Sequence, residues 1–212
     1  MTDIARPERI TVPGDVDFTM MYAAHDAFAR HLQWVIAAVE AGRARDAGTH
    51  ARWDLFAHQL HVHHTAEDEL LWPALEASID RPEGLLVLEA MEQEHAVIDP
   101  LLEQIAAAYV SGTDAELQDS LHRLQEGLLL HMRHEENEAL PLIATHLGRA
   151  GWARFGAGIR KMQGVSGAAV YLPWLLDGAL PATSAKVLKV LPAPARLIYR
   201  LRWLPKYRRG LR

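Results

Sequence analysis

The segment HHTAEDELLWP at residues 63–73 recurs in altered form as HMRHEENEALP at residues 131–141, at a constant offset of 68. Both copies begin with a histidine, place a glutamate four residues later and end at a proline. A single histidine precedes each copy, His25 before the first and His95 before the second. This order of single histidine, paired segment, single histidine, paired segment predicts two related helix pairs that face each other.

Four stretches around these segments have helical periodicity, because apolar residues recur at spacings of three and four. They span residues 18–39, 56–74, 85–109 and 117–142, and they are separated by short joints near Gly42, Gly48, Gly112 and Gly148. Short joints between long helices imply antiparallel neighbours. No strand-like alternation of useful length occurs, so we expect an all-α, antiparallel four-helix bundle. Pro73, Pro100 and Pro141 are each expected to end or kink a helix, since proline lacks an amide donor and crowds the preceding turn.

The expected organisation is an N-terminal arm over residues 1–14, the bundle over residues 15–148 and a C-terminal helical extension over residues 149–212. Half of the 212 residues are hydrophobic, which suffices for a full core. Cysteine is absent, and this excludes disulfides, iron–sulfur ligation and thiol catalysis, so any metal must bind nitrogen and oxygen. The first twenty residues do not read as a secretory signal, and a cytoplasmic location is expected.

Six polar side chains occupy positions where the helical stripes call for apolar residues: His25, His63, Glu67, His95, His131 and Glu135. Burying such groups without partners is unfavourable by roughly 1–3 kcal/mol each, and by more for a bare carboxylate. A spacing of four turns the second residue only about 40° from the first, so each His–Glu pair is expected to direct a nitrogen and an oxygen into the bundle. Four imidazoles and two carboxylates suit two divalent ions of the iron class rather than a single zinc, although manganese or zinc could load instead.

A simpler interpretation competes at each position, because a lone histidine on an apolar face is more often a hydrogen-bonded core residue than a metal ligand. Four such histidines on four stripes favour the metal. His61, His64 and His134 are expected to lie off the ligand-bearing stripe, and His31 is expected at the surface or as a donor to a ligand. Asp68 and Glu136 are interpreted first as surface charges of their helices, and a role in orienting an imidazole is the less favoured alternative.

The residues quoted above resemble the hemerythrin-like, or HHE cation-binding, family over roughly residues 15–148. The resemblance rests on His25-Asp26, the two paired segments and Glu94-His95. It implies a four-helix bundle with a non-haem di-iron centre, two iron ions joined by an oxo or hydroxo bridge. It also implies reaction with a small diatomic ligand or peroxide.

Asp99 stands where the oxygen carriers of the family have a second histidine on the third helix. This suggests a site that has one nitrogen ligand fewer and is more open. This favours an oxidoreductase of the catalase or peroxidase type acting on hydrogen peroxide, dioxygen or nitric oxide. The alternative is oxygen or iron binding, storage or sensing without turnover. Tyr22 and Asp99 are candidates for hydrogen bonding to the site from outside the ligand set, and a core role for Tyr22 is the competing interpretation.

The charge is unevenly distributed. Residues 186–212 carry nine basic and no acidic side chains, whereas residues 1–185 carry 27 acidic and 13 basic ones. Three interpretations follow, in this order: the tail packs on the acidic bundle of its own or a partner subunit, it lies on an anionic membrane surface at the inner face, or it binds nucleic acid. Nucleic acid is not expected, because no known binding module is present.

Overall fold

The computed structural model describes residues 9–210, so the first eight residues of the expected N-terminal arm and the last two of the extension lie outside it. Every regular element among the described residues is helical. The α-helices are α1 (Thr19–Glu40), α2 (Ala47–Ala66), α3 (Trp72–Glu76), α4 (Pro82–Ser111), α5 (Asp114–His134), α6 (Leu140–Leu142), α7 (Gly148–Leu176), α8 (Pro181–Val190), α9 (Ala193–Ile198) and α10 (Leu204–Gly210). Wider π-helical turns lie between them at η1 (Glu67–Leu71), η2 (Glu135–Ala139), η3 (Ile143–Leu147) and η4 (Tyr199–Trp203). The expected all-α class is confirmed.

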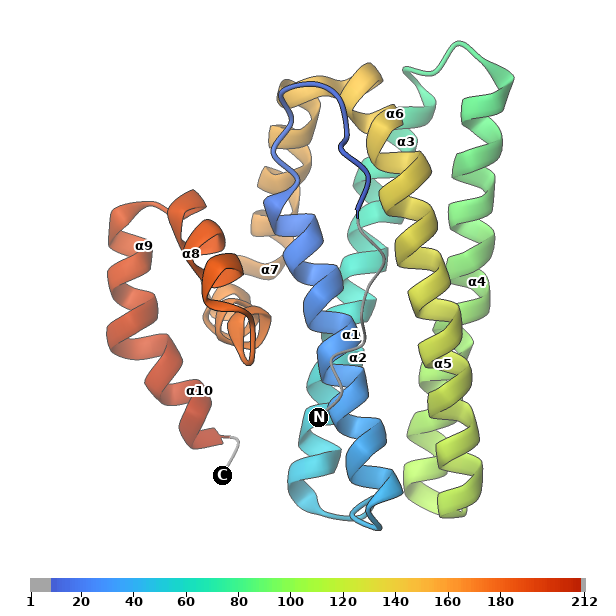
Figure 1. The fold of residues 1–212 in the computed structure, drawn as a ribbon, viewed down its shortest axis with the longest axis vertical. Helices are drawn as coiled ribbons and strands as arrows, with labels where there is room; N and C mark the ends of the chain where they lie inside the picture. Colours follow the sequence, from blue (N-terminus) through green and yellow to red (C-terminus); the bar gives the residue numbers. More distant parts are fainter. Residues whose placement is uncertain (1–8, 211–212) are drawn as a thin grey trace.

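The long helices α1, α2, α4 and α5 stand side by side as the bundle (Figure 1). Its apolar interior is divided into two clusters with a polar layer between them. On α1, Met21 belongs to one cluster and Phe28 to the other, with His25 between them. On α4, Met91 and Ile98 flank the next histidine in the same way. The polar layer is therefore enclosed on both sides by packed hydrocarbon.

The helix ends follow local sequence signals. Thr113 precedes α5, and its hydroxyl accepts a hydrogen bond from the Glu116 amide (3.2 Å) while the Glu116 carboxylate accepts one from the Thr113 amide (2.8 Å). This reciprocal cap satisfies two amide groups that the first turn leaves without partners. Helix α4 begins with Pro82 in its first turn, where the amide hydrogen that proline lacks would have no hydrogen-bond partner within the helix. It continues past Pro100 to Ser111, so Pro100 does not end it.

The π-helical turns η1 and η2 begin at Glu67 and Glu135, the two glutamates of the repeat. In each, an amide donates to the carbonyl five residues earlier, from Trp72 to Glu67 and from Leu140 to Glu135. The following proline explains the wide turn, because proline cannot donate to the carbonyl four residues before it and its ring collides with that carbonyl. Both prolines thus disturb their helices as expected.

A π turn inserts one residue, and the buried face shifts by one position after it. Continuing the spacing of three and four from Glu67 predicts Leu70 and Ala74 inside, but the structure buries Leu71 and Leu75 and leaves Leu70 partly covered and Ala74 exposed. The second copy shows the same shift, since Ile143 is buried rather than the expected Leu142. The expectation for these residues was wrong because it assumed 3.6 residues per turn throughout.

Helices α8, α9 and α10, with the turn η4, form a further layer (Figure 1). Helix α8 contacts α1, while η4 and α10 contact α7. Helix α7 bends at Gly164, whose φ of 63° is a left-handed conformation that glycine adopts without a side-chain clash. Its last carbonyls are bound from α1, where Arg30 donates to the carbonyls of Leu175 (2.9 Å) and Asp177 (2.7 Å). Among the described residues, no helix combines the length and the apolar character needed to cross a membrane.

Candidate metal centre

Two groups of donor atoms lie in the polar layer of the bundle. His64 of α2, His95 of α4 and His131 of α5 form the first, and His25 of α1, His63 of α2 and Glu135 at the start of η2 form the second. Within each group the donor atoms lie within 4.8 Å of one another. Each group therefore offers one ion three donors from three separate segments of the chain.

The carboxylate of Glu67 lies between the two groups. Its Oε1 is 3.2 Å from His63 Nε2 in the second group, and its Oε2 is 3.7 Å from His95 Nε2 in the first. Glu67 is fully buried. It can therefore give one oxygen to each of two ions, as a bridging carboxylate does.

Hydrogen bonds from carboxylates determine which ring nitrogens face inward in the first group. The Nδ1 atoms donate to Asp99 (His64, 2.7 Å), Asp68 (His95, 2.8 Å) and Glu94 (His131, 2.8 Å). An ionised carboxylate only accepts, so each Nδ1 carries the proton and each Nε2 of a neutral ring presents a lone pair. The Nε2 atoms of His95 and His131 are 3.1 Å apart. Two lone pairs at this distance repel each other unless a cation lies beside both.

A charged chain of contacts supports the second group from the outside. His25 Nδ1 donates to Glu136 Oε1 (2.8 Å), and its Nε2 is 2.9 Å from Glu135 Oε2. Arg9 in turn binds Glu136 (2.8 Å) and Asp26 (2.8 Å). These contacts connect the segment before α1 to the bundle at the level of His25, and they fix the orientation of its ring.

The pKa values of the buried groups in the layer also suit the binding of a cation. Burial, reinforced by the charges of Glu135 and Asp68, raises the pKa of Glu67 well above its usual value. Burial by itself would lower the pKa of His25, but the charge of Glu135 and hydrogen bonds to Glu135 and Glu136 raise it to about 9. Burial and neighbouring imidazoles hold the pKa of His63 and His64 well below the usual value, so both rings are neutral and suited to ligation.

The residues present fit a pair of metal ions. His63 Nε2, His64 Nε2 and both carboxylate oxygens of Glu67 and of Glu135 are buried, and apart from the close His–Glu contacts given above they make no hydrogen bond with any residue that the structure describes. Polar atoms in a protein interior normally have partners. Six such atoms in one layer are accounted for if cations bind them.

The six residues expected from the sequence all lie in this layer, but they divide between the groups differently than expected. His131 belongs to the first group and Glu135 to the second, so this pair spans both groups instead of meeting at one point. Residues four apart on a helix are separated by about 6 Å along its axis, which is enough to reach two sites. Glu67 spans the groups for the same reason.

His64 was expected to lie off the ligand-bearing stripe, and this expectation was wrong. Helix α2 faces both α1 and α4, so adjacent residues about 100° apart can both point inward. His63 lies beside His25, with ring centroids 5.5 Å apart, while His64 stacks on His95 at 3.9 Å. His64 places a further nitrogen in the first group, so the donor set is not one nitrogen poorer despite Asp99. The adjacent histidines at positions 63 and 64 were the signal that could have identified it.

Other expectations around the site also change. Asp99 does bond from outside the groups, to His64. Glu136 was interpreted as a surface charge but is buried and bonds the His25 imidazole, whereas Asp68 is exposed as expected and also bonds the His95 imidazole. The Tyr22 ring lies under the Arg9 guanidinium at 4.6 Å, and no hydrogen bond from its hydroxyl to a described residue is seen.

His31, expected at the surface or beside a ligand, is 2% exposed and bonds the Trp174 carbonyl. It is a core residue that joins α1 to α7, because its ring contacts Trp174 in the C-terminal region and not the two donor groups.

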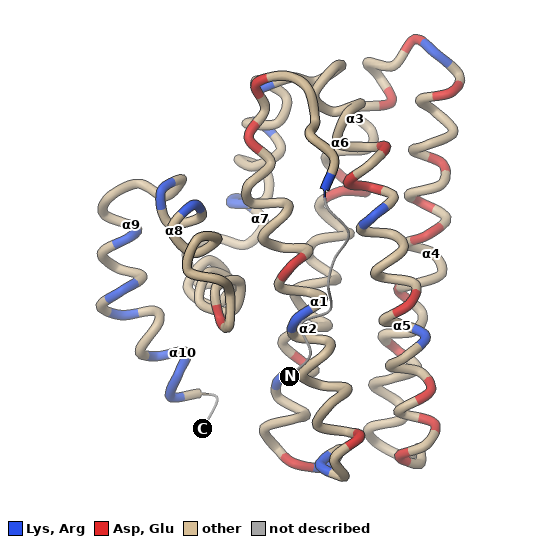
Figure 2. Tube along the Cα trace, viewed as in Figure 1, with Lys and Arg blue, Asp and Glu red and all other residues tan. Residues whose placement is uncertain are grey.

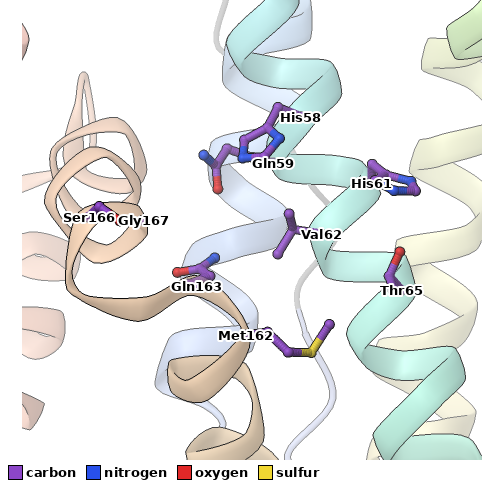
Figure 3. Close-up of a pocket in the computed structure, with 9 residues that line it drawn as sticks. All are labelled: His58, Gln59, His61, Val62, Thr65, Met162, Gln163, Ser166 and Gly167. Carbon is purple, nitrogen blue, oxygen red and sulfur yellow. The ribbon is translucent and has the colours of Figure 1, made fainter.

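A cavity of about 420 Å³ opens between α2 and the bend in α7 (Figure 3). Its lining includes Gln59, Val62 and Thr65 on α2 and Met162 and Gln163 on α7. None of the lining residues belongs to either donor group, but Gln59 lies about one turn before His63 on α2, and Val62 and Thr65 lie on either side of His63 in the sequence. Of the seven donor side chains, that of His63 is 12% exposed while the others are at most 3% exposed. The edge of the layer at His63 is therefore the more accessible one.

Comparison with protein families agrees with this geometry. Residues 16–143, more than half of the chain, match the family described as the hemerythrin HHE cation binding domain. The chain belongs to this family. The hemerythrin HHE match covers all seven donors, and it ends at Ile143, before α7 begins. No curated protein and no solved structure matches the chain.

Proposed function

We propose that the site holds two iron ions and reacts with a small oxidant of the class of hydrogen peroxide, dioxygen or nitric oxide. The observation that carries the proposal is the pair of donor groups on either side of Glu67. Imidazole nitrogens mixed with carboxylate oxygens, without any thiolate, suit iron. Two bound iron ions supply the redox chemistry by which two electrons can pass to an oxidant.

The residues of the chain have distinct roles in this proposal. His64, His95 and His131 hold one ion, His25, His63 and Glu135 hold the other, and Glu67 offers an oxygen to each. The carboxylates that bond the outward Nδ1 atoms orient the rings and increase their basicity. The apolar clusters on both sides keep water out of the layer. Because the second group has two imidazoles where the first has three, and because His63 is the more exposed donor, we assign the approach of small molecules to the His25 and His63 side.

Binding without turnover, in oxygen or iron carriage, storage or sensing, is the second candidate. The finding that favours it is His64, because the nitrogen that it contributes weakens the case for an unusually open site. The two candidates differ in whether an oxidant is consumed. The family match supports metal binding and does not distinguish between them.

The first test measures metal content and peroxide consumption. We expect two iron ions per chain by mass spectrometry, and evolution of oxygen when hydrogen peroxide is added. Protein loaded with zinc is the control, because the same ligands then hold an ion without redox chemistry. A stable, reversible optical change without oxygen evolution would favour the second candidate. A folded protein that binds neither iron nor zinc would contradict both.

The second test compares His64 with His61, an exposed histidine one turn earlier on the same helix. His64→Ala is expected to reduce the bound iron from two ions per chain to about one, because the first group then retains two imidazoles. His61→Ala should leave the iron content and the optical spectrum unchanged. Metal analysis and absorption spectra of both variants check this. Two ions retained in His64→Ala would show that His64 is not a ligand.

A further inference from the structure

The helical segment formed by α9, η4 and α10 has two apolar stripes. The inner stripe consists of Tyr199, Trp203 and Tyr207, which are buried or partly buried against the rest of the chain. Tyr207 also donates a hydrogen bond to Asp177 (3.3 Å). A helix needs only one apolar stripe to pack on a core. The inner stripe serves this purpose.

The outer stripe consists of Leu197, Ile198 and Leu201, at the spacing of one helix face, and these side chains are 58%, 44% and 72% exposed. Large aliphatic side chains grouped in this way on a solvent-facing helix are unusual, since single exposed ones are the norm. Packing within the chain does not explain the outer stripe. It is suited to contact with something outside the protein.

Cations surround the outer stripe. Arg200, Arg202, Lys206, Arg208 and Arg209 are exposed on the same segment, and α8 adds two exposed lysines. Figure 2 shows basic residues along α8, α9 and α10, whereas acidic residues predominate on α4 and α5. No ion pair joins a basic residue of α8–α10 to a carboxylate of the described chain. The tail therefore packs on its own bundle through apolar side chains, and its positive charge remains available.

We propose that the outer stripe and its surrounding cations form a surface that docks on an anionic lipid bilayer. An interfacial helix inserts aliphatic side chains at the level of the headgroups while lysine and arginine contact lipid phosphates. The outer stripe and its rim supply both parts of this interaction. The proposal does not depend on the metal or on the reaction at the bundle.

Two other partners fit the surface less well. In a symmetric dimer through the outer stripe, the cationic rims of both copies would be brought together, and like charges repel. Single-stranded nucleic acid is bound by cations together with exposed aromatic rings. Here the aromatic residues of the segment form the inner stripe and are turned toward the protein, while the exposed residues are aliphatic.

The test is co-sedimentation of the full chain with vesicles. We expect binding to phosphatidylcholine mixed with phosphatidylglycerol and little binding to phosphatidylcholine alone. Raising the salt from about 0.1 M to about 1 M shortens the screening length from about 10 Å to about 3 Å and should release most of the protein. Replacing Arg200, Arg202 and Lys206 with glutamine should weaken binding on the order of a hundredfold. The triple variant Leu197→Gln, Ile198→Gln, Leu201→Gln should weaken it by about tenfold or more.

Matched controls remove the same number of groups from the bundle. Arg81, Arg123 and Arg133 are exposed cations, and Leu85, Leu86 and Val110 are exposed apolar residues. Their replacement with glutamine should leave vesicle binding unchanged. Equal binding to both vesicle types, or equal losses in test and control variants, would overturn the proposal. Two further results would overturn it. One is no binding to vesicles together with salt-sensitive binding to DNA. The other is no binding to vesicles together with a dimer in sedimentation velocity that the outer-stripe variant dissociates.

Discussion

Replacing Glu67 with glutamine is expected to stabilise the metal-free protein and to destabilise the metal-loaded one. In the absence of ions, the Glu67 carboxyl is fully buried between two donor groups, and burial and its acidic neighbours disfavour its charge. A neutral amide of the same shape has no charge to desolvate, and its NH2 group can donate to the nearby Nε2 of His63 or His95, so we expect a gain of about 1–3 kcal/mol. With ions bound, the same substitution removes the carboxylate between them, and we expect a loss of about 3 kcal/mol or more, as for breaking a buried charge pair.

Denaturant unfolding with chelator and with added metal measures both effects, and metal analysis should show fewer than two ions per chain in the variant. Glu69→Gln is the matched control, because Glu69 lies on the same π turn but is exposed. It should change neither free energy by more than about 0.5 kcal/mol. If Glu67→Gln changes the stability in the same direction with and without metal, Glu67 does not lie between two ions.

Acid is expected to destabilise the protein through His31, at the junction of α1 and α7. The His31 Nε2 donates to the Trp174 carbonyl (2.9 Å), and the ring stacks on the Trp174 indole at 4.7 Å. Burial, together with the charges of Arg30 and Arg52, lowers the pKa of His31 to about 3 from 6.5. The folded-state pKa lies below that of the unfolded chain, so the unfolded chain binds the proton first as the pH falls. The contribution of His31 is complete above about pH 6.5 and decreases as the pH falls toward about 3, by as much as about 5 kcal/mol.

The substitution His31→Gln isolates this effect. A glutamine amide can still donate to the Trp174 carbonyl but does not titrate, so the variant should lose less stability than the parent between about pH 6.5 and pH 4. The ligand histidines titrate in both proteins, and their contribution cancels in the difference. His122→Gln, at an exposed position beside Glu40, should leave the pH dependence unchanged. Equal slopes for the parent and His31→Gln would show that His31 can be protonated in the folded protein.

The π turns η1 and η2 connect the repeat to the site. Each begins at a glutamate of the donor layer and is followed by a proline, and in both copies the buried face then shifts by one residue. Since π turns are rare in helices and occur often at functional sites, their position here is consistent with a role in directing Glu67 and Glu135 into the layer. Leu71 at the end of η1 and Ile143 after η2 belong to the same buried apolar cluster.

The sequence alone determined the four bundle helices and the six residues first placed inside, because helical period and polarity are local properties that a pattern shows directly. Tertiary structure decided three further features. It brought His64 inward, because α2 faces two neighbours at once. It assigned Asp68 and Glu136 to imidazoles, because those rings lie on other helices. It buried His31 under Trp174, because the C-terminal layer folds back on α1. Each of these depends on which segments meet in space, and spacing along one helix does not determine that.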